Sequence, residues 1–209
     1  MKKTIIGLLL FLSVSLCFAG GKVEGGIGYH GMIMNDSFYF EANQDYPELF
    51  MDVNETFSSF AINFAFITLL SESFGLGLHG NFLLRTEEEV FPFNGVDFFV
   101  GPVFTLYNSE KKSVTLSPGM HFSFMLLDDQ TMSKQIGLGG NVKGEYYLSK
   151  NVYAFASFLL SCDFYSWHSH GGTSGGNAIS GFGGKQAQEG SGNIFAWNIN
   201  PYVGLGYKL

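Results

Sequence analysis

A serine between two histidines is the group of residues in this chain best suited to chemistry. His168, Ser169 and His170 are consecutive, and Ser161 and Asp163 precede them. A serine hydroxyl activated by a histidine base is the nucleophile of many acyl-transfer reactions. The segment matches no catalytic motif of that kind, and two histidines are too few to close a zinc site. We therefore predict no catalytic residue, metal site or cofactor here.

A second group of polar residues falls on one parity of segments whose other parity is large and apolar. Its members are Glu24, His30, His79, Arg85, Asp97, His121, Lys143, Glu145 and Asp163. In an enclosed interior the acidic and basic members should pair, because breaking a buried ion pair costs roughly 3–5 kcal/mol. We predict a polar network that fills the interior; the alternative is a path lined for a small solute.

Acidic residues gather in the segment 35–56, which contains no basic residue. They are Asp36, Glu41, Asp45, Glu48, Asp52 and Glu55, and Glu87, Glu88 and Glu89 follow later. Carboxylates could take divalent cations or meet a basic extracellular partner, but no calcium-loop spacing is present. We interpret these segments as exposed loops. The Gly-rich segment 166–193 lacks the context of a phosphate loop and also predicts a surface loop.

The elements that carry these residues are indicated by strict alternation of large apolar and small or polar residues. The clearest case has Phe60, Ile62, Phe64 and Phe66 alternating with Ala61, Asn63 and Ala65. In a β-strand this pattern puts the large apolar side chains on one face and the small or polar ones on the other.

Eight segments alternate in this way: about 22–34, 57–69, 74–86, 95–107, 113–127, 136–148, 152–165 and 194–209. Each can cross a membrane as a tilted strand, which takes about 9–11 residues. The links 70–73, 108–112 and 149–151 are short, whereas 35–56, 87–94, 128–135 and 166–193 are long. This asymmetry is typical of bacterial outer-membrane barrels. We predict an all-β fold over 20–209, an eight-stranded antiparallel up-and-down transmembrane β-barrel.

Composition argues against the other classes of protein. The net charge is −7 with only 11 Lys and Arg residues, so no basic stripe exists to bind nucleic acid. No apolar run after residue 20 reaches the roughly 18 residues that a transmembrane helix needs. A secreted β-sandwich would also alternate, but its outer face would be richer in Lys and Glu than either parity here.

Residues 1–19 read as a cleaved signal peptide. A basic start precedes an apolar stretch over 5–16, and small residues favour cleavage after Ala19. The alternative is a lipoprotein signal in which Cys17 is acylated instead of removed. After cleavage Cys162 is the remaining cysteine, so we expect no intramolecular disulfide.

Three prolines lie inside predicted strands, where each removes a ladder hydrogen bond. They are Pro102, Pro118 and Pro201. If the 108–112 turn is centred on Glu110, Pro102 and Pro118 lie opposite one another and face lipid. We expect bulges or strand ends at these positions.

The end of the last segment resembles the C-terminal assembly signal of outer-membrane barrels. The residues that carry it are Tyr202, Gly204, Tyr207 and Leu209, although the usual final residue is Phe or Trp. The whole chain resembles the small eight-stranded barrels of the OmpA-transmembrane, OmpX and OmpW type. That resemblance implies insertion by the barrel-assembly machinery into the lipid of the bacterial outer membrane, and it implies no chemistry.

Together these patterns predict a non-enzymatic outer-membrane barrel with a structural or interaction role. Its acidic and Gly-rich loops would face the exterior and could meet an extracellular ligand. The alternatives are a narrow channel for small solutes and a lipid-modifying outer-membrane enzyme.

Overall fold

The structure, a computed structural model, describes residues 20–40, 49–84, 93–126, 131–170, 188–192 and 195–209. Its strands are β1 (Gly21–Phe40), β2 (Leu49–Leu69), β3 (Phe74–Leu84), β4 (Phe93–Asn108), β5 (Lys112–Leu126), β6 (Thr131–Tyr147), β7 (Val152–His170), β8 (Gln188–Gly192) and β9 (Phe195–Lys208). The described part of the chain holds no helix long and apolar enough to cross a membrane. The predicted signal peptide, 1–19, lies outside the described residues and stays a prediction.

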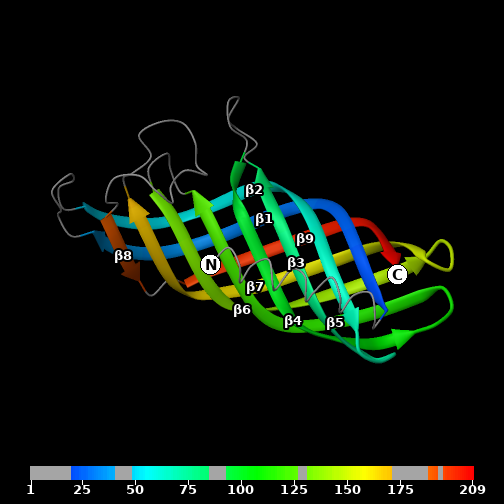
Figure 1. The fold of residues 1–209 in the computed structure, drawn as a ribbon. Coiled ribbons are helices and arrows are strands. Elements are labelled where there is room, and N and C mark those ends of the chain that lie inside the picture. The colour runs from blue at the N-terminus through cyan, green and yellow to red at the C-terminus, as the bar shows by residue number, and fades with distance from the viewer. Residues whose placement is uncertain (1–19, 41–48, 85–92, 127–130, 171–187, 193–194) are drawn as a thin grey trace, which may run out of the picture.

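The strands form one antiparallel sheet that closes on itself (Figure 1). Their order is β6-β5-β4-β3-β2-β1-β9-β7-β8, and a further pairing of β6 with β7 closes the wall. The short β8 pairs only with the far end of β7, beyond the last pair that β7 makes with β9. The closed wall therefore has eight strands, and the predicted barrel is confirmed.

Short turns join β2 to β3, β4 to β5 and β6 to β7 at one end of the barrel, as predicted. In the first of them the amide of Leu70 donates to the carbonyl of Phe74 at 3.0 Å. The start of β1 and the end of β9 lie at the same end, since Lys22 pairs with Lys208. Short turns mark the periplasmic end of a bacterial barrel, so we call this the turn end and the opposite one the loop end.

Several strands extend farther at the loop end than the sequence predicted. Pairing of β1 with β2 continues without interruption to Phe40 and Leu49, so much of the predicted loop 35–56 is a hairpin. Likewise β7 continues to His170 and pairs there with β8, so the predicted loop 166–193 begins as strand. Both extensions contain polar residues that interrupt the alternation, so the sequence alone resembled a loop there.

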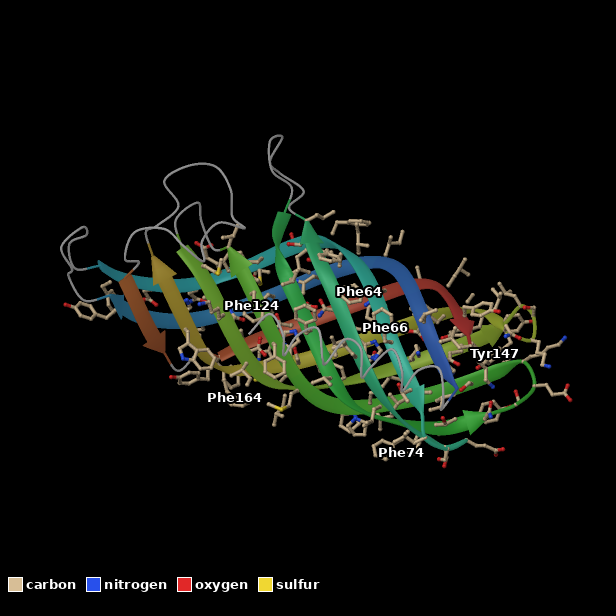
Figure 2. The ribbon with its side chains drawn as sticks, in the orientation of Figure 1. Phe64, Phe66, Phe74, Phe124, Tyr147 and Phe164 are labelled. Atoms are coloured by element: carbon tan, nitrogen blue, oxygen red, sulfur yellow. The ribbon has the colours of Figure 1, made fainter. Side chains whose placement is uncertain are left out.

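The wall presents large apolar side chains outward and small or polar ones inward. On β2, Phe60, Ile62 and Phe66 are 40, 44 and 39% exposed, whereas their inward neighbours Ala61 and Asn63 are each 2% exposed. The predicted parity of this strand is confirmed. Figure 2 shows Phe64 and Phe66 midway along the wall, Phe124 and Phe164 toward the loop end, and Phe74 and Tyr147 toward the turn end.

Aromatic residues collect at both ends of the apolar wall. At the loop end the rings of Tyr165 and Trp167 meet edge to face, with centroids 4.4 Å apart. At the turn end Tyr107, Tyr146 and Tyr207 are 53, 45 and 45% exposed. Girdles of this kind mark the two membrane interfaces of an outer-membrane barrel.

The prolines interrupt the ladders, but the strands continue through them without the expected bulges or strand ends. Between β4 and β5 no pairs are formed between the pairs Val100/Met120 and Phe104/Leu116, and the register there sets Pro102 opposite Pro118. On its other side each proline still lies within a regular ladder: Pro102 pairs with Leu76 of β3, and Pro118 pairs with Gly140 of β6. Because proline has no N–H, neither can donate to the other across this seam. Pro201 coincides with a similar gap between β1 and β9.

Candidate functional site

The barrel lumen contains the polar residues that the sequence placed on one parity. Each described member is at most 6% exposed: Glu24, His30, His79, Asp97, His121, Lys143, Glu145 and Asp163. Arg85 lies outside the described residues. The strands bring these side chains together from around the whole wall, because every second residue of each strand points to the barrel axis.

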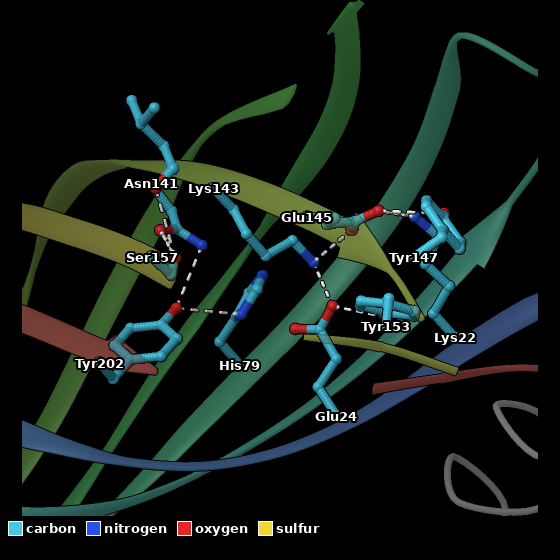
Figure 3. Close-up of polar contacts among 11 residues, drawn as sticks. Lys22, Glu24, His79, Asn141, Lys143, Glu145, Tyr147, Tyr153, Ser157 and Tyr202 are labelled. Atoms are coloured by element: carbon cyan, nitrogen blue, oxygen red, sulfur yellow. Dashed lines mark hydrogen bonds and ion pairs between the residues drawn. The ribbon is translucent and has the colours of Figure 1, made fainter. Parts of the chain in front are cut away.

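An ionic layer crosses the lumen near the turn end and joins β1 to β6 (Figure 3). The ammonium of Lys22 lies 2.6 Å from one carboxylate oxygen of Glu145, and the ammonium of Lys143 lies 3.1 Å from the other. Lys143 also pairs with Glu24. The hydroxyl of Tyr153 donates to Glu24 at 2.8 Å. Both lysines and both glutamates therefore have a partner of opposite charge within the layer.

An aromatic layer lies next along the axis. Phe99, Tyr153, Phe155, Leu159 and Tyr202 pack into one cluster and are all at most 4% exposed. The amide of Asn141 donates to the hydroxyl of Tyr202 at 3.1 Å, and the same hydroxyl lies 3.4 Å from Nδ1 of His79. Figure 3 shows these groups beside the ionic layer.

Two imidazoles and two carboxylates form a further layer. Nδ1 of His121 lies 2.9 Å from Asp163, which also accepts from the amide of Asn198 at 2.8 Å. Asp97 accepts from Asn81 at 2.6 Å. Nε2 of His30 and of His121 lie 3.6 and 3.8 Å from the other oxygen of Asp97. This layer links strands from opposite sides of the lumen.

An apolar layer fills the lumen toward the loop end. The cluster has no member more than 2% exposed and consists of Met32, Met34, Ala61, Leu83, Met125 and Ala196. The amide of Gln135 on β6 donates to the sulfur of Met34 on β1 at 3.4 Å. The four layers together occupy the lumen along much of its length.

The turn-end mouth is open. A recess of about 630 Å³ is lined by residues of the three short turns and by Lys22, which belongs to the ionic layer. The lining mixes Ser and Thr hydroxyls with charges of both signs, including Glu72, Glu110 and Lys150.

The serines and histidines first considered for catalysis lie inside the barrel where the structure describes them. Ser161 and Asp163 are buried in the lumen. His168 belongs to β7, and its Nε2 lies 2.8 Å from the hydroxyl of Ser166. Both residues are at most 2% exposed, so the wall separates this pair from lipid outside. The side chains of Ser169 and His170 lie outside the described ones, and no metal cluster occurs among the described residues.

The C-terminal residues divide between the two faces of β9. Tyr202 points inward and belongs to the aromatic layer, whereas Tyr207 and Leu209 are 45 and 54% exposed. Gly204 pairs with Gly26 of β1 at the closing seam. The assembly role of these residues stays a prediction.

Sequence reasoning missed several members of the lumen network. Lys22 shares the parity of Glu24, so alternation carried enough signal to find it. Tyr147 and Tyr153 donate to carboxylates, but tyrosine on an alternating strand reads as a wall residue. Asn81 and Asn198 carry no charge and gave no signal that they orient aspartates.

No protein-family model and no curated protein matches this chain. Solved structures match it in fold. The outer membrane protein OprG from Pseudomonas aeruginosa aligns over 91% of this chain and 96% of its own, at 12% identity and a TM-score of 0.52. Neisserial surface protein A aligns over 90% of this chain and 97% of its own, at 10% identity and a TM-score of 0.50.

The chain has the fold of a bacterial outer-membrane β-barrel. At these identities the similarity concerns the fold alone. The outer-membrane localisation predicted from the sequence agrees with this fold and with the apolar, aromatic-bordered wall of the barrel.

Proposed function

We propose that this outer-membrane barrel is a non-enzymatic, non-conducting anchor that holds its loop-end extensions at the cell surface for a structural or interaction role. The observation that carries the proposal is the filled lumen. Its ionic layer runs from Lys22 through Glu145 and Lys143 to Glu24, and thus ties β1 to β6 across the axis.

Geometry and energetics both support a closed lumen. An eight-stranded barrel is just wide enough inside to be filled by side chains or to hold one small ligand. A solute passing the ionic layer would have to separate buried ion pairs, at roughly 3–5 kcal/mol for each pair broken. The apolar layer toward the loop end offers a polar solute few hydrogen-bonding groups in place of the water that the solute would lose.

A narrow channel for small solutes is the second candidate. Among the described residues, both amide atoms of Asn200 and the hydroxyl of Ser161 are buried without a protein partner. Buried polar atoms are usually satisfied, often by water, so these atoms favour some hydration of the lumen.

Conductance in a planar bilayer separates the two candidates. The refolded protein, shown to be folded by a heat-modifiable gel band and inserted by co-flotation with vesicles, should give no discrete openings. Reproducible unitary openings from the same preparation would replace the anchor with the channel.

A further inference from the structure

Lys134 is a charged residue on the lipid-facing side of the wall. The sequence predicted a loop over 128–135, but β6 begins at Thr131, so Lys134 lies on that strand. Its neighbours Ser133 and Gln135 are 0 and 2% exposed and face the lumen, so Lys134 faces outward. The other charged residues of β6, Lys143 and Glu145, face inward and are paired.

Its height on the wall is that of a membrane interface. The outward positions of β6 from Ile136 to Tyr146 carry only apolar residues, glycine or tyrosine. Ten residues at about 3.3 Å rise and a tilt of about 40° cover about 25 Å, the height of the apolar band of such barrels. Lys134 is the next outward position beyond Ile136, at the loop-end rim of the band.

Aromatic residues flank this lysine on both neighbouring strands. Lys134 pairs with Phe124 on β5 and with Trp167 on β7. Their side chains are 39 and 45% exposed, and Tyr165 packs edge to face on Trp167. No carboxylate of the described residues forms an ion pair with Lys134.

We propose that Lys134, with Phe124 and Trp167 beside it, binds the phosphate of a phosphorylated glycolipid in the outer leaflet. An ionisable residue at membrane depth that has no counter-ion in the described part of the chain points to a partner of opposite charge. A lysine near the rim extends its ammonium to the headgroup level while its stem stays in apolar surroundings. There it can make a charge-assisted bond to a phosphate oxygen, and the two rings can pack against the acyl chains. The proposal rests on the outer-membrane location and is independent of whether the lumen conducts.

Lys112 provides a matched control. It also faces outward beside an aromatic residue, since it pairs with Tyr146, but it lies at the turn end of the wall. The protein would be refolded in detergent as wild type, Lys134→Gln and Lys112→Gln, each verified by the heat-modifiable band. Replacing a lipid-facing charge by an amide should leave folding intact.

Native mass spectrometry with bis-phosphorylated lipid A then tests the site. We expect one lipid retained by wild type and Lys112→Gln, at least tenfold weaker retention by Lys134→Gln, and weak retention of dephosphorylated lipid A by wild type. Inorganic phosphate at millimolar concentration should not displace the lipid. Equal retention by Lys134→Gln, equal retention of the dephosphorylated lipid, or displacement by inorganic phosphate would each overturn the proposal.

Discussion

His121 on β5 and Asp163 on β7 form a hydrogen bond of 2.9 Å over the strand that separates them. The residue between them is Gly137 of β6, which pairs with His121 on one side and with Asp163 on the other. A Cβ atom added at Gly137 would overlap both the carboxylate of Asp163 and the backbone of β7 at Cys162 and Asp163. The absence of a side chain on β6 is therefore what lets the two residues meet.

Gly137→Ala should destabilise the barrel by about 1–3 kcal/mol, the usual cost of forcing extra atoms into a packed interior. Gly144→Ala on the same strand is the control, because a Cβ there meets nothing within 4 Å. The free energy of unfolding by urea in lipid vesicles measures both. Equal stability of the two variants would contradict the close packing of β7 against Gly137 that the bond between His121 and Asp163 requires.

Lys143→Met should lower the free energy of unfolding by about 3–5 kcal/mol, because it leaves buried carboxylates without their shared cation. Lys143 contacts both Glu24 and Glu145, and among the described residues only Lys22 remains to balance them. Adding Glu24→Gln to Lys143→Met should recover part of the loss, as expected for residues that interact directly. Lys150→Met, in the exposed turn after β6, should change stability by no more than about 0.5 kcal/mol. If Lys143→Met and Lys150→Met lowered the free energy of unfolding by similar amounts, the result would argue against the ionic layer.

Alternation was sufficient to predict the barrel because each strand must present one face to lipid and the other to the lumen. The predicted inward positions of Asp97, His121 and Asp163 follow directly from that rule. Which inward residues meet across the axis is set by strand tilt and register, and a single sequence does not contain these. The link from Lys22 to Glu145 spans 123 residues of sequence, and no local pattern predicts it.

The loop-end extensions escaped prediction for a different reason. Where β1 and β2 rise above the membrane, neither face has to be apolar, so the alternation weakens although the ladder continues to Phe40 and Leu49. The acidic residues of the segment 35–56 then favoured the prediction of a loop. The same holds for His168, whose place on β7 is fixed by pairing with β6 and β8.

The proline seam between β4 and β5 should be a weak point of the wall. Pro102→Val and Pro118→Val together restore two N–H donors. Each can donate to the carbonyl of the opposite residue, which in the wild type lacks this donor inside the membrane. We expect the double variant to gain about 1 kcal/mol or more in free energy of unfolding, since an unsatisfied buried group costs about 1–3 kcal/mol. Each single variant should gain about half. A loss of stability in the double variant would show that the prolines do not weaken the wall at this seam.

Phe64→Arg tests whether the outer wall faces lipid. Phe64 lies midway along β2 among other rings, with its centroid 5.4 Å from that of Phe82. An arginine at the midplane should cost about 2–4 kcal/mol, whereas Ile136→Arg, next to the loop-end rim, should cost only about 0–1 kcal/mol. Phe64→Leu separates loss of ring packing from introduction of the charge and should cost less than Phe64→Arg. Unfolding in vesicles reports all three, and only a wall immersed in hydrocarbon makes the cost of arginine depend on depth. Equal costs at the two arginine positions would mean that the barrel does not span a bilayer in the orientation inferred from its girdles.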